Sequence, residues 1–258
     1  MAGKLNLNAD LGESFGPWSM GNDSAMLDIV DSANVACGFH GGDPAVMLET
    51  ARLARENNVS IGAHPSFPDL QGFGRRRMDV SPAELEAMLI YQIGALQACA
   101  FASGAKVTHV KPHGALNNIA CENRKIAEAI ASAVWRVDPG LILLGPAASQ
   151  IIHAGRDKGL PVVEEIFADR AYLDDGNLVP RGQPGAMIHG AEASLEHVMR
   201  IVGEGALISI NGKRIPVNPQ SICVHGDNET AAATAKKLRE GLIAAGYLLL
   251  PLPDLLES

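Results

Sequence analysis

The chain of 258 residues has 21 basic and 29 acidic side chains, a formal net charge of −8, and is 47% hydrophobic and 19% charged. This balance excludes a disordered chain, and the acidic excess with only 4% aromatic residues disfavours a nucleic-acid partner. No apolar run approaches the roughly 20 residues that span a bilayer, and the N-terminal residues lack the apolar core of a signal peptide. We therefore expect a cytoplasmic protein that contacts no membrane.

Cysteine usage agrees with that compartment. The cysteines are Cys37, Cys99, Cys121 and Cys223, without a Cys-x-x-Cys pair. This pattern predicts reduced, mostly buried thiols and no thiolate zinc site.

Short apolar runs alternate with longer helical patterns along the whole chain. The runs cover 5–9, 33–39, 59–63, 107–110, 141–144, 162–167 and 221–224, with a shorter one at 186–188. The helical patterns cover 44–57, 81–103, 123–137, 147–158, 192–202 and 228–245, the second opened by a Ser-Pro-Ala-Glu capping box. Such alternation predicts an α/β fold with a parallel sheet covered on both faces. Seven or eight units fit a closed (β/α) barrel, which predicts a single domain over residues 1–258.

Two segments fall outside this alternation. Residues 206–217 place Asn211-Gly212 between apolar alternations, which predicts a small β-hairpin insertion. The apolar tail 248–253 follows the last helix, and we expect it to pack on its own barrel.

Polar residues follow the apolar runs, where the carboxyl ends of barrel strands converge on one mouth. They are Asp10, Glu13, His40, Asp43, His64, Lys111, His113, Asp169, His225 and Asp227. Imidazoles and carboxylates gathered there suit general acid/base catalysis or a metal site with nitrogen and oxygen ligands. The candidate ligands for one divalent metal are Asp10, His40, His64 and His113. An ion-free acid/base site uses the same residues, and the pattern leaves both readings open.

Two further features near these motifs have two readings each. His109 lies inside the fourth apolar run, out of phase with His113, which favours a hydrogen-bonded core histidine over a site residue. The loop that follows the third run carries Arg75, Arg76 and Arg77. It is either a clamp for a carboxylate or phosphate or a solvated basic loop, since three adjacent arginines cannot all point inward.

Seven motifs resemble the LamB/YcsF family, in order along nearly the whole chain. They are NADLGE at 8–13, ACGFHGGDP at 36–44, GAHP at 62–65, DLQGFGRRRM at 69–78, VKPHGAL at 110–116, FADRAY at 167–172 and VHGD at 224–227. Two positions depart from the family pattern: Asn117 stands where tyrosine is expected, and Gly41 replaces the usual alanine. The Asn117 departure bears on a contact near His113 and not on the resemblance.

The resemblance implies an irregular (β/α)7-like barrel similar to the glycoside hydrolase/deacetylase folds. It also implies one subunit of an ATP-dependent 5-oxoprolinase, which opens the lactam of 5-oxo-L-proline to L-glutamate together with B and C subunits. ATP is then a co-substrate, because phosphorylation turns an unactivated amide into an electrophile that water can attack. The chain carries no P-loop motif, so either it binds ATP by another mode or a partner supplies that step.

The catalytic candidates in this hypothesis are Asp10, Glu13, His40, His64, Lys111 and His113. One of the two carboxylates acts as general base on water, the imidazoles bind the reacting carbonyl or shuttle protons, and the lysine stabilises developing negative charge. The substrate-binding candidates are Asp43, Arg75, Arg76, Asp169, Arg170, His225 and Asp227. Two other functions stay open: a stand-alone metal-dependent amide hydrolase of the deacetylase type, and a non-catalytic substrate-binding subunit.

Overall fold

Seven parallel strands close into a barrel in the computed structural model, which describes residues 3–224 and 231–257. The strands are β1 (Lys4–Leu11), β2 (Ser32–Ala36), β3 (Ser60–His64), β4 (Val107–Val110), β5 (Ile142–Pro146), β6 (Val162–Phe167) and β9 (Ser221–Val224). Strand β9 pairs with both β6 and β1, so these strands form a closed ring. Their residues are almost all buried, as expected for parallel strands covered on both faces. The predicted α/β barrel is therefore confirmed, with seven strands.

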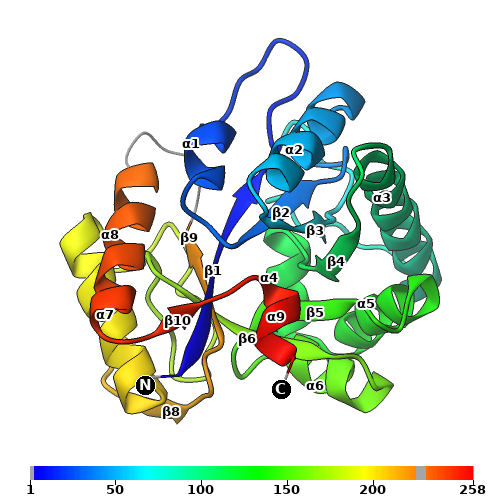
Figure 1. Cartoon of the computed structure of the whole chain (residues 1–258). Helices are drawn as coiled ribbons and strands as arrows, with labels where there is room; N and C mark the ends of the chain where they lie inside the picture. Colours follow the sequence, from blue (N-terminus) through cyan, green and yellow to red (C-terminus); the bar gives the residue numbers. More distant parts are fainter. Residues whose placement is uncertain (1–2, 225–230, 258) are drawn as a thin grey trace.

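Helices surround this ring, and one of them, α4 (Gly114–Glu122), is drawn within its outline in Figure 1. They are α1 (Asp23–Leu27), α2 (Pro44–Glu56), α3 (Pro82–Ala102), α4 (Gly114–Glu122), α5 (Arg124–Val137), α6 (Gln150–Lys158), α7 (Ala191–Glu204) and α8 (Ala231–Ala244). Neighbours α3 and α5, α5 and α6, and α7 and α8 pack against one another. Leucine, isoleucine, valine and alanine side chains fill the layer between helices and strands.

Local capping chemistry explains where several helices begin. The Asp43 carboxylate accepts hydrogen bonds from two backbone N–H groups in the first turn of α2. Ser81 and Asn123 cap α3 and α5 in the same way. Such caps satisfy N–H donors that have no partner within the helix. The predicted starts of these three helices agree with the structure to within one residue.

Several elements differ from the expectations. The apolar run 186–188 is not a barrel strand, since Met187 forms only an isolated bridge with Arg170. Helix α6 begins three residues after its predicted start, because Ala148 has a φ of 63° and Ser149 is extended, so neither has the right-handed helical conformation. The sequence analysis did not identify α1 or α4. Helix α4 begins at Gly114 without a side-chain cap, so it lacks the usual start signal.

Helix α3 corrects the expectation about apolar runs. Within the described part of the chain it is the one helix that is long and apolar enough to cross a membrane by length and composition. In the structure it packs against α2, α5, β3 and β4. Leu89, Ile93 and Leu96 are fully buried there. Several of its apolar residues therefore form the buried face of a helix that packs on the barrel.

The predicted hairpin is present. Strands β7 (Ala206–Ile208) and β8 (Arg214–Pro216) pair antiparallel on either side of Asn211-Gly212. Gly212 has a φ of 81°, the left-handed conformation that the tight turn requires and that glycine adopts without a steric penalty.

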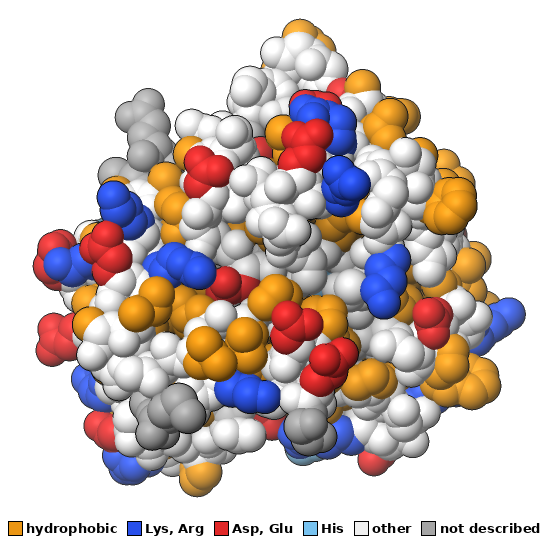
Figure 2. Space-filling view, viewed as in Figure 1, with side chains coloured by type: hydrophobic (Ala, Val, Ile, Leu, Met, Phe, Trp, Pro, Cys, Tyr) orange, Lys and Arg blue, Asp and Glu red, His pale blue; other side chains and the backbone are white. Residues whose placement is uncertain are grey.

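The C-terminal tail packs on its own barrel, as predicted. Strand β10 (Leu248–Leu249) pairs with the start of β1, and α9 (Leu252–Leu256) lies near the amino ends of the strands, close to the described N-terminus (Figure 1). Leu252 is fully buried. Figure 2 shows hydrophobic side chains gathered over β10 and α9 on this face, with acidic and basic side chains interspersed around them.

Candidate active site

A cavity of about 490 Å³ opens at the carboxyl ends of the strands. Five of the six catalytic candidates line it: Asp10, Glu13, His64, Lys111 and His113. The sixth, His40, stacks on His113 with ring centroids 3.8 Å apart. The structure therefore brings together residues from the ends of β1, β2, β3 and β4.

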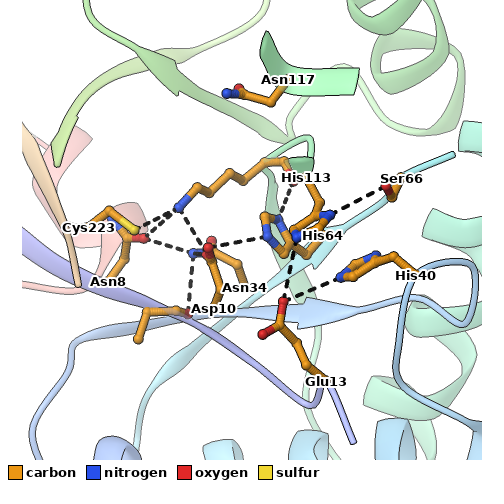
Figure 3. Close-up of polar contacts among 12 residues, drawn as sticks. Asn8, Asp10, Glu13, Asn34, His40, His64, Ser66, His113, Asn117 and Cys223 are labelled. Atoms are coloured by element: carbon orange, nitrogen blue, oxygen red, sulfur yellow. Dashed lines mark hydrogen bonds and ion pairs between the residues drawn. The ribbon is translucent and has the colours of Figure 1, made fainter. Parts of the chain in front are cut away.

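Asp10 is held from one side and faces an imidazole on the other (Figure 3). Its Oδ1 accepts hydrogen bonds from Lys111 Nζ and Asn34 Nδ2, both at 2.9 Å. Its Oδ2 lies 3.4 Å from His64 Nε2. Burial alone would lower the pKa of Lys111, but the carboxylate of Asp10 and other neighbouring acidic groups raise it well above its usual value. The lysine therefore remains a cation at neutral pH.

Glu165 is a second buried carboxylate beneath this pair, and the sequence analysis missed it. Its Oε1 lies 3.0 Å from Lys111 Nζ and accepts a hydrogen bond from Asn8 Nδ2 at 2.9 Å. Burial raises the pKa of Glu165, while Lys111 lowers it. The pair Glu164-Glu165 inside the apolar run 162–167 is a signal that could have identified it, because buried carboxylates need partners.

Three histidines form a compact aromatic group beside Asp10. The rings of His40 and His113 are parallel to within 4°, and His64 stands edge-on to both. Burial lowers the pKa of His40 and of His113 well below its usual value, and the neighbouring imidazoles act in the same direction. Both rings are therefore neutral at pH 7 and offer lone pairs to a ligand.

Glu13 completes a group that could hold a metal ion. Its Oε1 lies 3.4 Å from His40 Nε2 and 3.8 Å from His113 Nε2. Together with His64, these residues place four ligand atoms within 4.8 Å of one another. The set expected from sequence contained Asp10 and not Glu13; in the structure, Asp10 lies beside this group, next to His64.

Arginines form another part of the cavity wall. Arg170 is buried, and burial lowers its pKa to about 10, with Arg181 acting in the same direction. Its Nη2 donates to the carbonyl oxygen of Val179 at 2.7 Å, while its buried Nε has no hydrogen-bond partner among the described residues. The guanidinium of Arg75 lies 5.0 Å from the ring centroid of Phe73. Both Arg75 and Arg181 line the cavity, so this wall suits an anionic group.

In the described part of the chain, three of the other substrate-binding candidates, Asp43, Arg76 and Asp169, are not among the residues that line the cavity. Asp43 caps α2. Arg76 forms an ion pair with Asp69 of the same loop, and 63% of its side chain is exposed. Asp169 is half-buried and is not among the described residues that line the cavity. His225 and Asp227 lie outside the described residues.

Two residue types complete the description. The four cysteines are free, as predicted, and the thiol of Cys223 lies 3.1 Å from Lys111 Nζ.

Asn117, which departs from the family pattern, lines the cavity on α4, apart from the histidine group (Figure 3). Its amide therefore faces the cavity from a different side than the three histidines do.

These features define a class: a (β/α)-barrel protein with buried carboxylate, imidazole and ammonium groups at its mouth, suited to acid/base chemistry. The chain belongs to the LamB/YcsF family, which it matches over residues 5–257. A relative from Gluconobacter oxydans (strain 621H), named as the A subunit of 5-oxoprolinase, is 55% identical over 242 residues. The alignment covers 94% of this chain and 95% of that protein.

Two solved structures share the fold. The lactam utilization protein from Thermus thermophilus is 45% identical, with a TM-score of 0.90, over 96% of this chain and 100% of that one. The catalytic domain of a peptidoglycan N-acetylglucosamine deacetylase from Eubacterium rectale ATCC 33656 is 11% identical, with a TM-score of 0.52, over 97% and 88% of the two chains. The second likeness concerns the fold alone, and it agrees with the predicted deacetylase-type barrel.

Proposed function

We propose that this chain, as a single barrel domain over residues 1–258, is a subunit of an ATP-dependent 5-oxoprolinase. With B and C subunits, it opens the lactam of 5-oxo-L-proline to L-glutamate in the cytoplasm. The observation that carries the proposal is the Asp10 carboxylate, held at the cavity by Lys111 and facing His64. The relative named as the A subunit of 5-oxoprolinase, similar along 94% of the chain, supports the same reaction.

Attack of water on a lactam carbonyl needs a base and a group that stabilises the oxygen as it becomes negative. Asp10 is the proposed base, because Lys111 and Asn34 occupy its Oδ1 and leave Oδ2 toward the imidazoles. Glu13 is the alternative base. Lys111 acts through Asp10 as a positioning residue, since its ammonium is already engaged by carboxylates.

The imidazoles and arginines receive the remaining roles. The rings of His40, His64 and His113 bind the reacting carbonyl or carry a proton to the ring nitrogen that leaves. Arg170 and Arg75 bind the substrate carboxylate or a phosphate, because both line the cavity.

ATP makes the amide reactive. Transfer of the γ-phosphoryl group to the lactam oxygen releases ADP and leaves a carbon that water attacks. The C–N bond then breaks as the ring nitrogen takes up a proton, which leaves the γ-carboxyl phosphate of glutamate. A second water hydrolyses this acyl phosphate, so the products are glutamate, ADP and phosphate. Since the sequence has no P-loop motif, the proposal assigns this activation to the assembled complex and not to a site on this chain.

The experiment is a turnover assay of the chain together with its B and C partners, ATP and 5-oxo-L-proline. We expect Asp10→Asn and His113→Gln each to lower glutamate release by roughly 10²- to 10⁴-fold, the usual loss when an acid or base is removed. The exposed His153→Gln is the matched control and should retain full activity. Full glutamate release by both site variants would rule out the proposed roles.

A second candidate function is a stand-alone metal-dependent amide hydrolase of the deacetylase type. The group of Glu13 and three histidines favours it. Hydrolysis of an acetylated or lactam substrate by the isolated, metal-loaded chain without ATP would support this function. A third candidate, a non-catalytic substrate-binding subunit, would bind 5-oxo-L-proline in calorimetry while no cavity variant changed turnover of the complex.

A further inference from the structure

We propose that the mouth of the barrel contains a binding site for one divalent transition-metal ion of the zinc type, formed by Glu13, His40, His64 and His113. The site lies in the cavity to which the lactam reaction is assigned. It does not depend on that reaction, because it follows from the ligand atoms themselves. It uses Glu13 where the sequence suggested Asp10.

The hydrogen bond made by His64 Nδ1 leaves the lone pair of Nε2 facing the carboxylate of Asp10. Its Nδ1 lies 2.6 Å from the carbonyl oxygen of Lys111, and a carbonyl only accepts, so Nδ1 carries the proton. In the neutral ring Nε2 is then an acceptor, yet it lies 3.4 Å from Asp10 Oδ2 and has no hydrogen-bond partner among the described residues. Two acceptors at this distance are stabilised by a cation beside them, and a proton or a metal ion at Nε2 supplies one.

The number of converging atoms favours a metal ion over a proton. A proton joins two atoms, whereas four ligand atoms lie within 4.8 Å of one another here. Zinc–ligand bonds of about 2.1 Å place the ligands of a tetrahedral site roughly 3.4 Å apart. The distances from Glu13 Oε1 are 3.4 Å to His40 Nε2 and 3.8 Å to His113 Nε2. These two distances are close to tetrahedral spacing, and all four atoms lie within 4.8 Å, so closing of the side chains around an ion completes the coordination.

His40 gives independent support. Its side chain is fully buried, and neither ring nitrogen has a hydrogen-bond partner among the described residues. Buried polar atoms are rarely left without partners, because the loss of their hydration is costly. Ligation of an ion by one of these nitrogens supplies such a partner.

An outer layer of contacts orients the rings, as in known metal sites. The Lys111 carbonyl fixes His64. Ser66 Oγ lies 3.4 Å from His113 Nδ1, and the buried Gln92 side chain bonds both the N–H and the carbonyl of Ser66 at 2.9 Å. These partners leave the Nε2 atoms of His64 and His113 directed at the proposed ion.

The donor set determines the class of metal. Three imidazole nitrogens and one carboxylate suit Zn²⁺, Co²⁺, Ni²⁺ or Fe²⁺, whereas Mg²⁺ and Ca²⁺ prefer oxygen ligands throughout. An ion in this wall of the cavity would polarise a carbonyl oxygen of a bound substrate.

The test is direct metal binding by the untagged full chain after removal of metals with a chelator. Zn²⁺ is titrated in competition with a chromophoric chelator, and Co²⁺ is followed by its visible d–d absorption. We expect one ion per chain. Glu13→Gln and His64→Gln should weaken zinc binding by more than the roughly 10- to 100-fold that loss of an outer-layer partner costs. Ser66→Ala should fall within that range.

Two controls separate this proposal from the others. His197→Gln removes a histidine that is equally buried but lies on α7, and zinc affinity should stay unchanged. Asp10→Asn should still bind one ion per chain, with affinity weakened by at most the roughly 10- to 100-fold of an outer-layer partner, while losing turnover. Failure of the lactam hypothesis and failure of the metal site therefore give different results. Absence of stoichiometric binding by the wild-type chain would overturn the proposal, and so would unchanged affinity in folded Glu13→Gln and His64→Gln variants. The wild-type Co²⁺ spectrum decides the question even where a variant does not fold.

Discussion

Lys111 balances the charge of the barrel interior. Its side chain is almost fully buried, with Nζ 2.9 Å from Asp10 Oδ1 and 3.0 Å from Glu165 Oε1. Two carboxylates therefore share one ammonium, and Asn8 and Asn34 provide further hydrogen bonds. A buried charge without a partner is far more costly than a buried pair, because desolvation is no longer offset.

This balance predicts a large effect of removing the cation. Lys111→Met should lower the free energy of unfolding by about 3–5 kcal/mol, since it removes the ammonium that two buried carboxylates share. Urea unfolding at pH 7 measures the change. The double variant Lys111→Met/Glu165→Gln should recover part of the loss, because one of the two charges is gone. A loss below about 1 kcal/mol would instead show that the carboxylates need no ammonium, as at exposed pairs.

At the residue scale, the sequence predicts which groups meet at the mouth but not what holds them. Asp10, His64 and His113 follow apolar runs, and strand ends in a barrel converge. Asn8, Asn34 and Glu165 lie within the strands. In β1 the alternation Leu-Asn-Leu-Asn-Ala-Asp places Asn8 on the same face as Asp10, but it does not show which residues of the other strands that face meets. Their pairing with the mouth residues therefore appears only in the folded chain.

At the scale of the secondary-structure elements, the His109 side chain on β4 contacts residues of β2 and β3. Its Nε2 lies 3.0 Å from Asn34 Oδ1 on β2, and its Nδ1 lies 2.9 Å from Thr108 Oγ1 on β4. A Cβ atom at Gly62 on β3 would lie 2.1 Å from the ring, so this glycine makes room for the imidazole. The prediction of a hydrogen-bonded core histidine is confirmed.

These contacts predict an acid-sensitive fold. Burial lowers the pKa of His109 to about 3, and Lys111 and His64 act in the same direction. The unfolded imidazole has a pKa of about 6.5. Between these values only the unfolded state binds the proton, so the free energy of unfolding falls as the pH falls, by about 1.4 kcal/mol per pH unit from this residue.

Urea unfolding of wild type and His109→Gln across this pH range checks the sign and size of the effect. The variant should show a shallower loss of stability toward acid, by about that slope. His153→Gln, an exposed histidine, is the control and should follow the wild type. Parallel curves for wild type and His109→Gln would contradict the assignment.

The elements themselves were predictable where start signals and apolar runs coincide. Asp43-Pro44 and Ser81-Pro82 are N-cap and first-turn pairs, and α2 and α3 begin there. The same Asp43 also follows a strand, so its position alone could not separate capping from substrate binding. Helix α4 begins at a glycine with a φ of 56° and has no side-chain cap, so no local sequence signal predicts its start. It packs against α5 and α6, and such tertiary packing stabilises most helices in proteins.

At the scale of the whole molecule, the two ends of the barrel differ in kind. The carboxyl end holds the polar cavity, while the amino end is covered by the chain's own C-terminal tail. Which strands close the ring depends on contacts between residues more than 200 positions apart, such as Asn8 with Ser221. Alternation of runs predicts a barrel, but it does not specify this closure.

The final prediction concerns the covered end. Leu252 is fully buried against Ile142, Leu144 and Val163, and its N–H donates to Ser32 Oγ. Leu252→Ala should therefore lower the free energy of unfolding by about 2–5 kcal/mol through the cavity it leaves. Because this contact lies at the amino ends of the strands, zinc affinity and KM below the melting temperature should not change. The exposed Leu248→Ala on β10 is the matched control. A changed KM in Leu252→Ala would show that the two ends are coupled.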